Sequence, residues 1–189
     1  MAAVDPPNKG WFEISDLQAG DRTLAEQLTG LDPLFGMVGG ASILDLGCAE
    51  GLISLEMMKA GAKLAHGVEG VDSRVETARR LFEGRNAAFF VADLSVFANA
   101  PPAGLLPSYD AVLLLSIAHK FKDPAEFIRA AVARCSRYVA VRLPAPVIQD
   151  RRSDYVPVDV PRLMASLGFG QIHDAPGPRA EWVGIFERA

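Results

Sequence analysis

The stretch from Ser42 to Gly51 places a short apolar run directly before two glycines and a second apolar run. Residues 43–46 have the character of a buried strand, and residues 52–58 have that of a helix. Gly47 and Gly51 allow a sharp turn between them and leave space beside the backbone, because glycine has no side chain. Open α/β sheets bind their ligands at the carboxyl ends of strands. The stretch therefore predicts a small-molecule site at a strand-to-helix turn.

Beyond this turn, strand-like and helix-like runs alternate with short joints. Strands are expected at 43–46, 64–69, 88–91, 109–115 and 137–143, and helices at 52–60, 73–82, 124–134 and 160–166, with Asp72 or Ser73 capping the second helix. Such alternation predicts parallel strands covered on both faces. Two last strands, 170–174 and 182–187, are joined by too few residues for a helical crossover and should pair antiparallel. The expected fold class is α/β: a Rossmann-like doubly wound, mostly parallel seven-stranded sheet with helices on both faces and a C-terminal antiparallel hairpin.

The N-terminal part of the chain stands outside this alternation. We expect residues 1–40 to be an N-terminal extension and residues 41–189 to be the ligand-binding domain, since 189 residues suit a single core. Leucines at helical spacing predict one amphipathic helix over 23–34, capped by Thr23 or Asp21. The extension either covers an edge of the sheet or forms a lid over the ligand.

The composition of the chain limits the classes of partner that it can bind. The net charge of −4 disfavours DNA, because nucleic-acid binders carry a basic face, although RNA stays open. The chain has no run of about 18 apolar residues that would span a membrane. Its first residues lack the pattern of a secretion signal, so a cytoplasmic location is expected. Cys48 and Cys135 have no companions at metal-ligand spacing, so we expect no metal site.

Three acids fall at or just beyond predicted strand ends. They are Asp45, Glu69 and Asp93, and the carboxyl ends of parallel strands line one crevice. A carboxylate after the second strand can accept both hydroxyls of a ribose, and Glu69 has this position. Each acid taken alone is better explained as a solvated loop residue or a helix cap. Their joint position behind a glycine turn favours a binding site.

These motifs resemble those of class I S-adenosylmethionine-dependent methyltransferases. Residues 43–51 resemble the first motif of that family, 67–73 the second, 90–94 the adenine segment, and 109–124 the motif near the transferable methyl group. The resemblance covers about residues 40–188 in the right order. A hydride-transferring dehydrogenase is the nearest competitor, but its G-x-G-x-x-G fingerprint is missing here.

The resemblance implies S-adenosylmethionine as the cofactor and an enzyme that transfers its methyl group. It implies that Glu69 binds the ribose, that Asp93 takes the adenine amine, and that the backbone N–H of Leu94 meets the adenine ring. Ala49 departs from the family, in which many members have glycine. The expected cofactor-binding residues are Asp45, Gly47, Cys48, Gly51, Glu69, Gly70, Asp93, Leu94 and Ser116.

His119, after the fourth strand, is the candidate general base, because an imidazole titrates near neutral pH. The alternative is a histidine that shapes the site or bonds within the core. His66 and His173 are expected to be structural. Arg22 could reach a carboxylate of the cofactor or of an anionic substrate, or could be a surface charge, and residues 151–155 are either an acceptor-selecting loop or a solvated connection.

The acceptor is expected to be a small molecule, methylated on oxygen, nitrogen or carbon. No separate substrate domain is evident, and Ser116 to His119 stand where amino-methyltransferases of nucleobases carry Asn/Asp-Pro-Pro-Tyr. A weak likeness of residues 10–17 to the lead-in of some tRNA-modifying enzymes keeps RNA open. A cofactor-binding sensor without activity is the remaining alternative, and the intact set of acids and glycines favours an enzyme.

Overall fold

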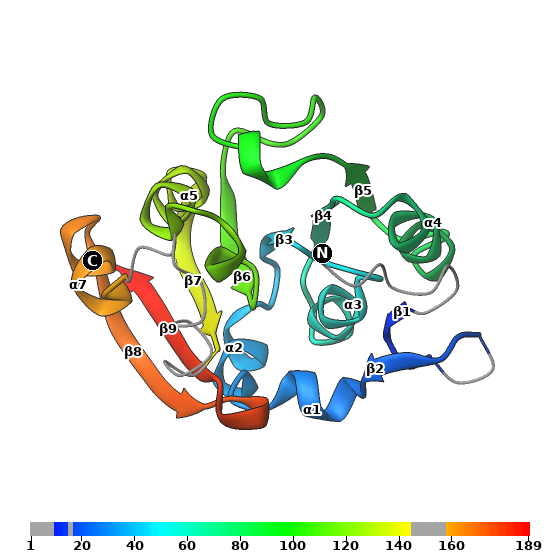
Figure 1. The fold of residues 1–189 in the computed structure, drawn as a ribbon, viewed down its shortest axis with the longest axis horizontal. Helices are drawn as coiled ribbons and strands as arrows, with labels where there is room; N and C mark the ends of the chain where they lie inside the picture. Colours follow the sequence, from blue (N-terminus) through cyan, green and yellow to red (C-terminus); the bar gives the residue numbers. More distant parts are fainter. Residues whose placement is uncertain (1–9, 15–16, 145–157) are drawn as a thin grey trace.

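A computed structural model describes residues 10–14, 17–144 and 158–189 (Figure 1). Its main sheet has seven strands in the order β5-β4-β3-β6-β7-β9-β8. Neighbouring strands are parallel from β5 to β7, whereas β9 pairs antiparallel with both β7 and β8. The strands are β3 (Ser42–Leu46), β4 (Leu64–Glu69), β5 (Ala87–Val91), β6 (Tyr109–Leu115), β7 (Cys135–Leu143), β8 (Phe169–Pro176) and β9 (Trp182–Arg188). The predicted fold class is confirmed.

Helices cover both faces of the sheet, because the central strands are apolar on both sides. On one face, α5 (Pro124–Val132) and α7 (Val160–Ser166) pack on side chains such as Leu114 and Val141. On the other, α2 (Asp32–Met37), α3 (Leu52–Lys59) and α4 (Asp72–Leu81) pack on β3 and its neighbours. The sequence order of the strands reverses between β3 and β6, and doubly wound folds bind ligands at this switch point.

The helix expected over 23–34 is wrong as a single element. The structure has α1 (Leu24–Leu28) and α2, with Gly30 in the left-handed region at φ 81° between them. Thr23 caps α1 as predicted, in a reciprocal capping box with Glu26. Pro33 stands in the first turn of α2, where its missing N–H costs nothing, so it begins a helix and does not end one.

The start of α4 is a second correction. Its N-cap is Val71, which makes no side-chain capping bond, and Asp72 lies inside the first turn. The backbone N–H groups of Gly70 and Val71 instead donate to the Glu69 carboxylate, at 2.9 and 3.0 Å. The acid at the end of β4 therefore orders the two residues that precede α4, and the N-cap that the sequence assigned to Asp72 or Ser73 is Val71.

A second, two-stranded sheet joins β1 (Gly10–Phe12) to β2 (Gly20–Arg22) in parallel. Three short 3₁₀ turns complete the described elements, η1 (Leu94–Val96), η2 (Ala118–Lys120) and η3 (Pro178–Ala180). No helix in the described part of the chain is long and apolar enough to cross a membrane. The predicted loop at 151–155 lies outside the described residues.

Candidate functional site

The glycine turn after β3 needs glycine at both positions. Gly47 and Gly51 each have φ 78°, in the region that disfavours side chains. A Cβ on Gly47 would lie 2.9 Å from the Ile117 side chain, and one on Gly51 would lie 3.0 Å from Phe89. The N–H of Gly47 donates to the Val68 carbonyl at 2.8 Å, which joins the turn to the end of β4.

Two residues of this region carry backbone strain. Ala49 has φ 48°, and Ser116 at the end of β6 has φ 56°. Non-glycine residues rarely adopt such values, and they cluster at functional sites. Ala49 and Ser116 lie on either side of the switch point, where the sequence predicts the ligand.

Glu69 is held rigidly at the end of β4. One carboxylate oxygen accepts the N–H groups of Gly70 and Val71, and the other accepts the N–H of Ala49 at 3.1 Å. Three of the four lone-pair sites of the carboxylate are thus occupied, and the oxygen that accepts from Ala49 can still accept a hydroxyl group. Beside the Glu69 carboxylate, the Val71 side chain is 41% exposed and provides an apolar surface. A nucleoside needs both, because its sugar hydroxyls bind a polar group and its flat base packs on an apolar one.

Asp93 lies on the neighbouring strand end. The N–H of Ala92 donates to the Glu69 carbonyl at 3.0 Å, which brings the ends of β4 and β5 together. The Asp93 carboxylate accepts the Ser95 N–H at 2.8 Å, and hydrogen bonds from Ser95 lower its pKa. Leu94 is buried, and it lines a pocket of about 360 Å³ that opens toward Phe121 and Phe127. The structure thus places the predicted adenosine residues side by side.

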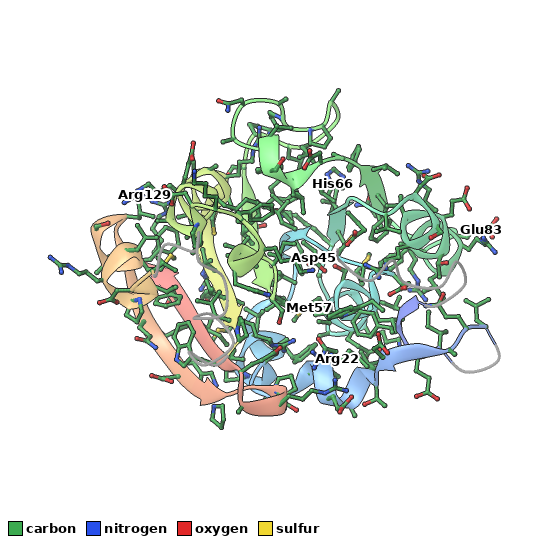
Figure 2. All side chains as sticks on the ribbon, viewed as in Figure 1. Arg22, Asp45, Met57, His66, Glu83 and Arg129 are labelled. Carbon is green, nitrogen blue, oxygen red and sulfur yellow. The ribbon has the colours of Figure 1, made fainter. Side chains whose placement is uncertain are left out.

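Asp45 differs from the other two acids because it is buried. Figure 2 places it near the middle of the molecule, on β3. Its carboxylate accepts the Ser54 hydroxyl at 2.7 Å, and burial raises its pKa to about 6, with the charge of Glu69 acting in the same direction. A buried carboxylate that is costly to ionise is well matched to a ligand cation such as an ammonium group.

Of the remaining predicted residues, Cys48 and His66 are buried, and His119 lies near the glycine turn. Cys48 is buried with Phe82 and Phe89, and desolvation raises its pKa well above the usual range, which agrees with a structural thiol. His119 lies in η2, two residues after Ile117, the residue that packs on Gly47. It is therefore near the turn. His66 is structural, with Nδ1 2.7 Å from the Tyr109 hydroxyl.

Glu50 is a residue of the site that sequence reasoning missed. Although it is fully buried, its carboxylate accepts the N–H of Trp11 at 2.8 Å, the N–H of Phe12 at 3.1 Å and the Gln18 amide at 3.0 Å. The β1 strand is thus bound to the glycine turn, whereas the edges of the main sheet are β5 and β8. The signal in the sequence for this role was the position of an acidic residue, Glu50, within the motif between two apolar runs.

A second group lies beyond β6, and it joins Arg22 and Ser116, which the sequence analysis named, to Arg142 and Glu181, which it missed. Arg142 of β7 is fully buried, with Nε 3.7 Å from Glu181, and Arg22 of β2 approaches the same carboxylate at 3.8 Å. Arg142 also donates to the side chain and the carbonyl of Gln27, and the Ser116 hydroxyl donates to Glu181 at 3.3 Å. An arginine inside the apolar run of a central strand was the signal in the sequence.

A doubly wound sheet with a glycine turn at its switch point and acids at three adjacent strand ends defines an α/β protein that binds a nucleoside-bearing small molecule. Residues 43–140 match the model of a family described as "Methyltransferase domain", and the chain belongs to this family. It is a class I S-adenosylmethionine-dependent methyltransferase. No curated protein matches the chain.

Solved structures share the fold at low sequence identity. The magnesium protoporphyrin IX methyltransferase of Synechocystis PCC 6803, solved with bound S-adenosylmethionine, is 17% identical with a TM-score of 0.68, and the match covers 87% of this chain and 81% of that one. The N-methyltransferase NodS of Bradyrhizobium japonicum WM9, solved with S-adenosylhomocysteine, is 13% identical with a TM-score of 0.69, covering 87% and 86%. An S-adenosylmethionine-dependent methyltransferase of Mesorhizobium loti is 15% identical with a TM-score of 0.65, covering 82% and 96%.

Proposed function

We propose that this methyltransferase acts on a small-molecule acceptor, with the cofactor lying across the ends of β5, β4 and β3. The observation that carries the proposal is the Glu69 carboxylate, fixed by three N–H donors beside a strained glycine turn. Glu69 accepts the ribose hydroxyls, and Asp93 with the Leu94 N–H receives the adenine. Asp45 faces the ammonium group of the methionine part, while Gly47, Cys48, Gly51, Gly70 and Ser116 shape the surrounding wall.

Little covalent chemistry is required of the protein. When bound, S-adenosylmethionine supplies a methyl group on a positively charged sulfur that leaves as a neutral thioether. The residues of the site align the acceptor with that methyl group and keep water out, which accounts for most of the acceleration. Where the acceptor must lose a proton, His119 is the proposed base, since it lies in η2 two residues after Ile117, which packs on the turn.

Two observations favour a small acceptor over RNA. The chain carries a net charge of −4, and phosphate contacts need a basic surface. The extension that precedes β3 folds onto the glycine turn through Glu50, which encloses the turn and does not extend outward as a platform for a polymer. Solved structures of similar fold include a putative RNA methyltransferase as well as a magnesium protoporphyrin IX methyltransferase, so the RNA alternative is an outcome of the test.

The test combines binding with turnover. Calorimetry with S-adenosylhomocysteine should show one site, and Glu69→Ala should weaken it at least tenfold, whereas Glu76→Ala on the exposed face of α4 should not. Methyl-labelled cofactor is then incubated with metabolite and RNA pools, and label is expected in a small molecule. Label in RNA would replace the proposed acceptor, binding without transfer to either pool would indicate a sensor, and failure to bind would refute the cofactor assignment of the site.

A further inference from the structure

The group around Arg142 joins five residues from five segments of the chain. We call it the arginine cluster: Arg22, Gln27, Ser116, Arg142 and Glu181. It lies at the ends of β6 and β7, on the opposite side of the switch point from Glu69 and Asp93. Because neighbouring strands are about 4.8 Å apart, β7 is about 10 Å from β3, a span suited to a second ligand beside the cofactor.

Buried donors in the arginine cluster lack acceptors. Within the described residues, Arg22 Nη1, Gln27 Nε2 and Arg142 Nε are buried and have no hydrogen-bond acceptor. The Glu181 carboxylate is the nearest anion, but its distances of 3.8 and 3.7 Å to the two arginines are too long for hydrogen bonds. Leaving such donors unpaired is costly, and native proteins seldom do so without a functional reason.

Cationic side chains also gather beside the cluster. Two arginines face one glutamate inside the cluster, and Arg22, Arg74 and Lys120 lie 5.3 to 6.0 Å from the centre of the Trp11 ring. An anionic group would supply acceptors for the donors of the cluster.

We propose that the arginine cluster binds a carboxylate group of the methyl acceptor, so that the substrate is an acidic small molecule. This inference rests on the proposed function, since it places the acceptor beside the cofactor. Arg22, whose side chain is 14% exposed, makes the contact, and Arg142 behind it is a positioning residue that fixes Glu181 and Gln27. A carboxylate suits the site because its two oxygens match the forked donors of a guanidinium group.

The first experiment uses simple probes on the protein saturated with S-adenosylhomocysteine. Benzoate and acetate are titrated by calorimetry against their neutral amides, benzamide and acetamide. Each carboxylate is expected to bind at least tenfold more tightly than its amide. Arg22→Gln should remove this preference, and Arg22→Lys should restore part of it. Arg129→Gln is the matched control, because Arg129 is exposed on α5, on the opposite side of the molecule from Arg22 (Figure 2).

A second variant separates binding from a purely structural role. Glu181→Gln removes the anion that competes for the arginines, so carboxylate affinity should rise several-fold while Arg22→Gln lowers it. If the cluster only held the fold together, both variants would weaken binding alike, and that result would overturn the proposal. Equal affinity of carboxylates and amides for the wild-type protein would overturn it as well.

The cofactor carries a carboxylate of its own, and a further comparison distinguishes the two sources. 5′-Methylthioadenosine lacks the amino-acid part of S-adenosylhomocysteine. If Arg22→Gln weakens S-adenosylhomocysteine strongly but leaves 5′-methylthioadenosine unchanged, the arginines bind the cofactor and the acceptor assignment is wrong. If S-adenosylhomocysteine does not bind the wild-type protein at all, the proposed function has failed, which is a different result from loss of benzoate binding alone.

Discussion

Asp45 combines two demands that conflict in a single side chain. It lies in the core at 3% exposure, where ionisation is expensive, yet the proposed ligand needs its negative charge. Its pKa of about 6, against an ordinary value of 3.8, measures that conflict, and the cause is burial. Ionised Asp45 therefore lowers the stability of the fold at neutral pH, but it presents a negative charge to the proposed ligand. Such a loss of stability is usual where binding residues are buried.

Replacing Asp45 by asparagine should make the folded protein more stable at neutral pH. Because the folded-state pKa is raised, the carboxylate destabilises the fold above pH 6, and this penalty is absent below about pH 4. Two pKa units correspond to at most about 3 kcal/mol, so we expect a gain of about 1–3 kcal/mol at pH 8 and none near pH 4. Urea unfolding at both pH values measures it.

The control for this prediction is Asp110→Asn, for which the sign is opposite. The Ser42 N–H, 2.8 Å from the Asp110 carboxylate, lowers its pKa. Ionised Asp110 therefore stabilises the fold above its ordinary pKa, and its removal should lower stability at pH 8. A loss of stability at pH 8 in both variants would contradict the account of Asp45.

The ionisation of Asp45 should also make cofactor binding depend on pH. Protonated Asp45 cannot pair with an ammonium group, and at pH 5 only about a tenth of a carboxyl group with a pKa of about 6 is ionised. The dissociation constant of S-adenosylhomocysteine should therefore fall about tenfold between pH 5 and pH 7.5, as the competent fraction rises. Calorimetry across this range tests it, and Asp45→Asn should bind weakly with a flat pH profile. An unchanged profile in the variant would assign the titration to another group.

Ala49 offers a test of backbone strain at the turn. A residue with a Cβ at φ 48° is disfavoured, so Ala49→Gly should raise stability by about 0.5–1 kcal/mol, the strain relief exceeding the entropy cost of glycine. Gly51→Ala is the opposing control, since its new Cβ would lie 3.0 Å from Phe89 at φ 78°. The Tm of thermal unfolding should rise for Ala49→Gly and fall for Gly51→Ala. Two downward shifts would show that the methyl group of Ala49 packs usefully.

At the scale of elements, the fold depends on contacts between segments that are distant in sequence. The β1 strand is held to the glycine turn by Glu50, and Phe12 is buried in the core cluster that α2 and α3 share. We propose that β1 and β2 act as a lid that Glu50 holds closed, and a lid is one of the two interpretations that the sequence left open for the N-terminal extension. The location of β1 at the turn, away from both sheet edges, supports this interpretation.

The lid predicts a change in local opening. Glu50→Gln replaces a carboxylate that accepts two backbone N–H groups by an amide with a single acceptor oxygen, which leaves at least one buried donor unpaired. Amide exchange in β1 should accelerate at least tenfold, while exchange in β6 should be unchanged. Glu56→Gln, on the outer side of α3, is the matched control. Equal acceleration in β6 would mean that Glu50 supports the whole fold.

At the scale of the whole molecule, the features that could be predicted from the sequence are those with a local signal in it. Continuous apolar runs such as 109–115 mark buried parallel strands, and Gly47 and Gly51 mark the turn, so the strands and the turn could be predicted from the sequence. The errors concern residues whose role depends on a distant partner. Glu69 binds the backbone before α4, Glu50 binds the N-terminal strand, and Arg142 of β7 pairs with Gln27 of α1. Such pairings have no periodicity in the sequence.

The whole-molecule prediction concerns how ligands act on the fold. Glu69, Asp93 and Asp45 belong to three strands of one sheet that shares its core with the helices on both faces, so the described domain should unfold in one transition. S-Adenosylhomocysteine at 100 times its dissociation constant should stabilise this domain by about 2.7 kcal/mol, which corresponds to a rise in Tm of roughly 5–10 °C for a chain of this length. NAD at the same concentration should produce no shift, because the acids beside the glycine turn repel a diphosphate. Scanning calorimetry with each ligand tests both statements, and stabilisation by NAD in place of S-adenosylhomocysteine would return the site to the dehydrogenase class.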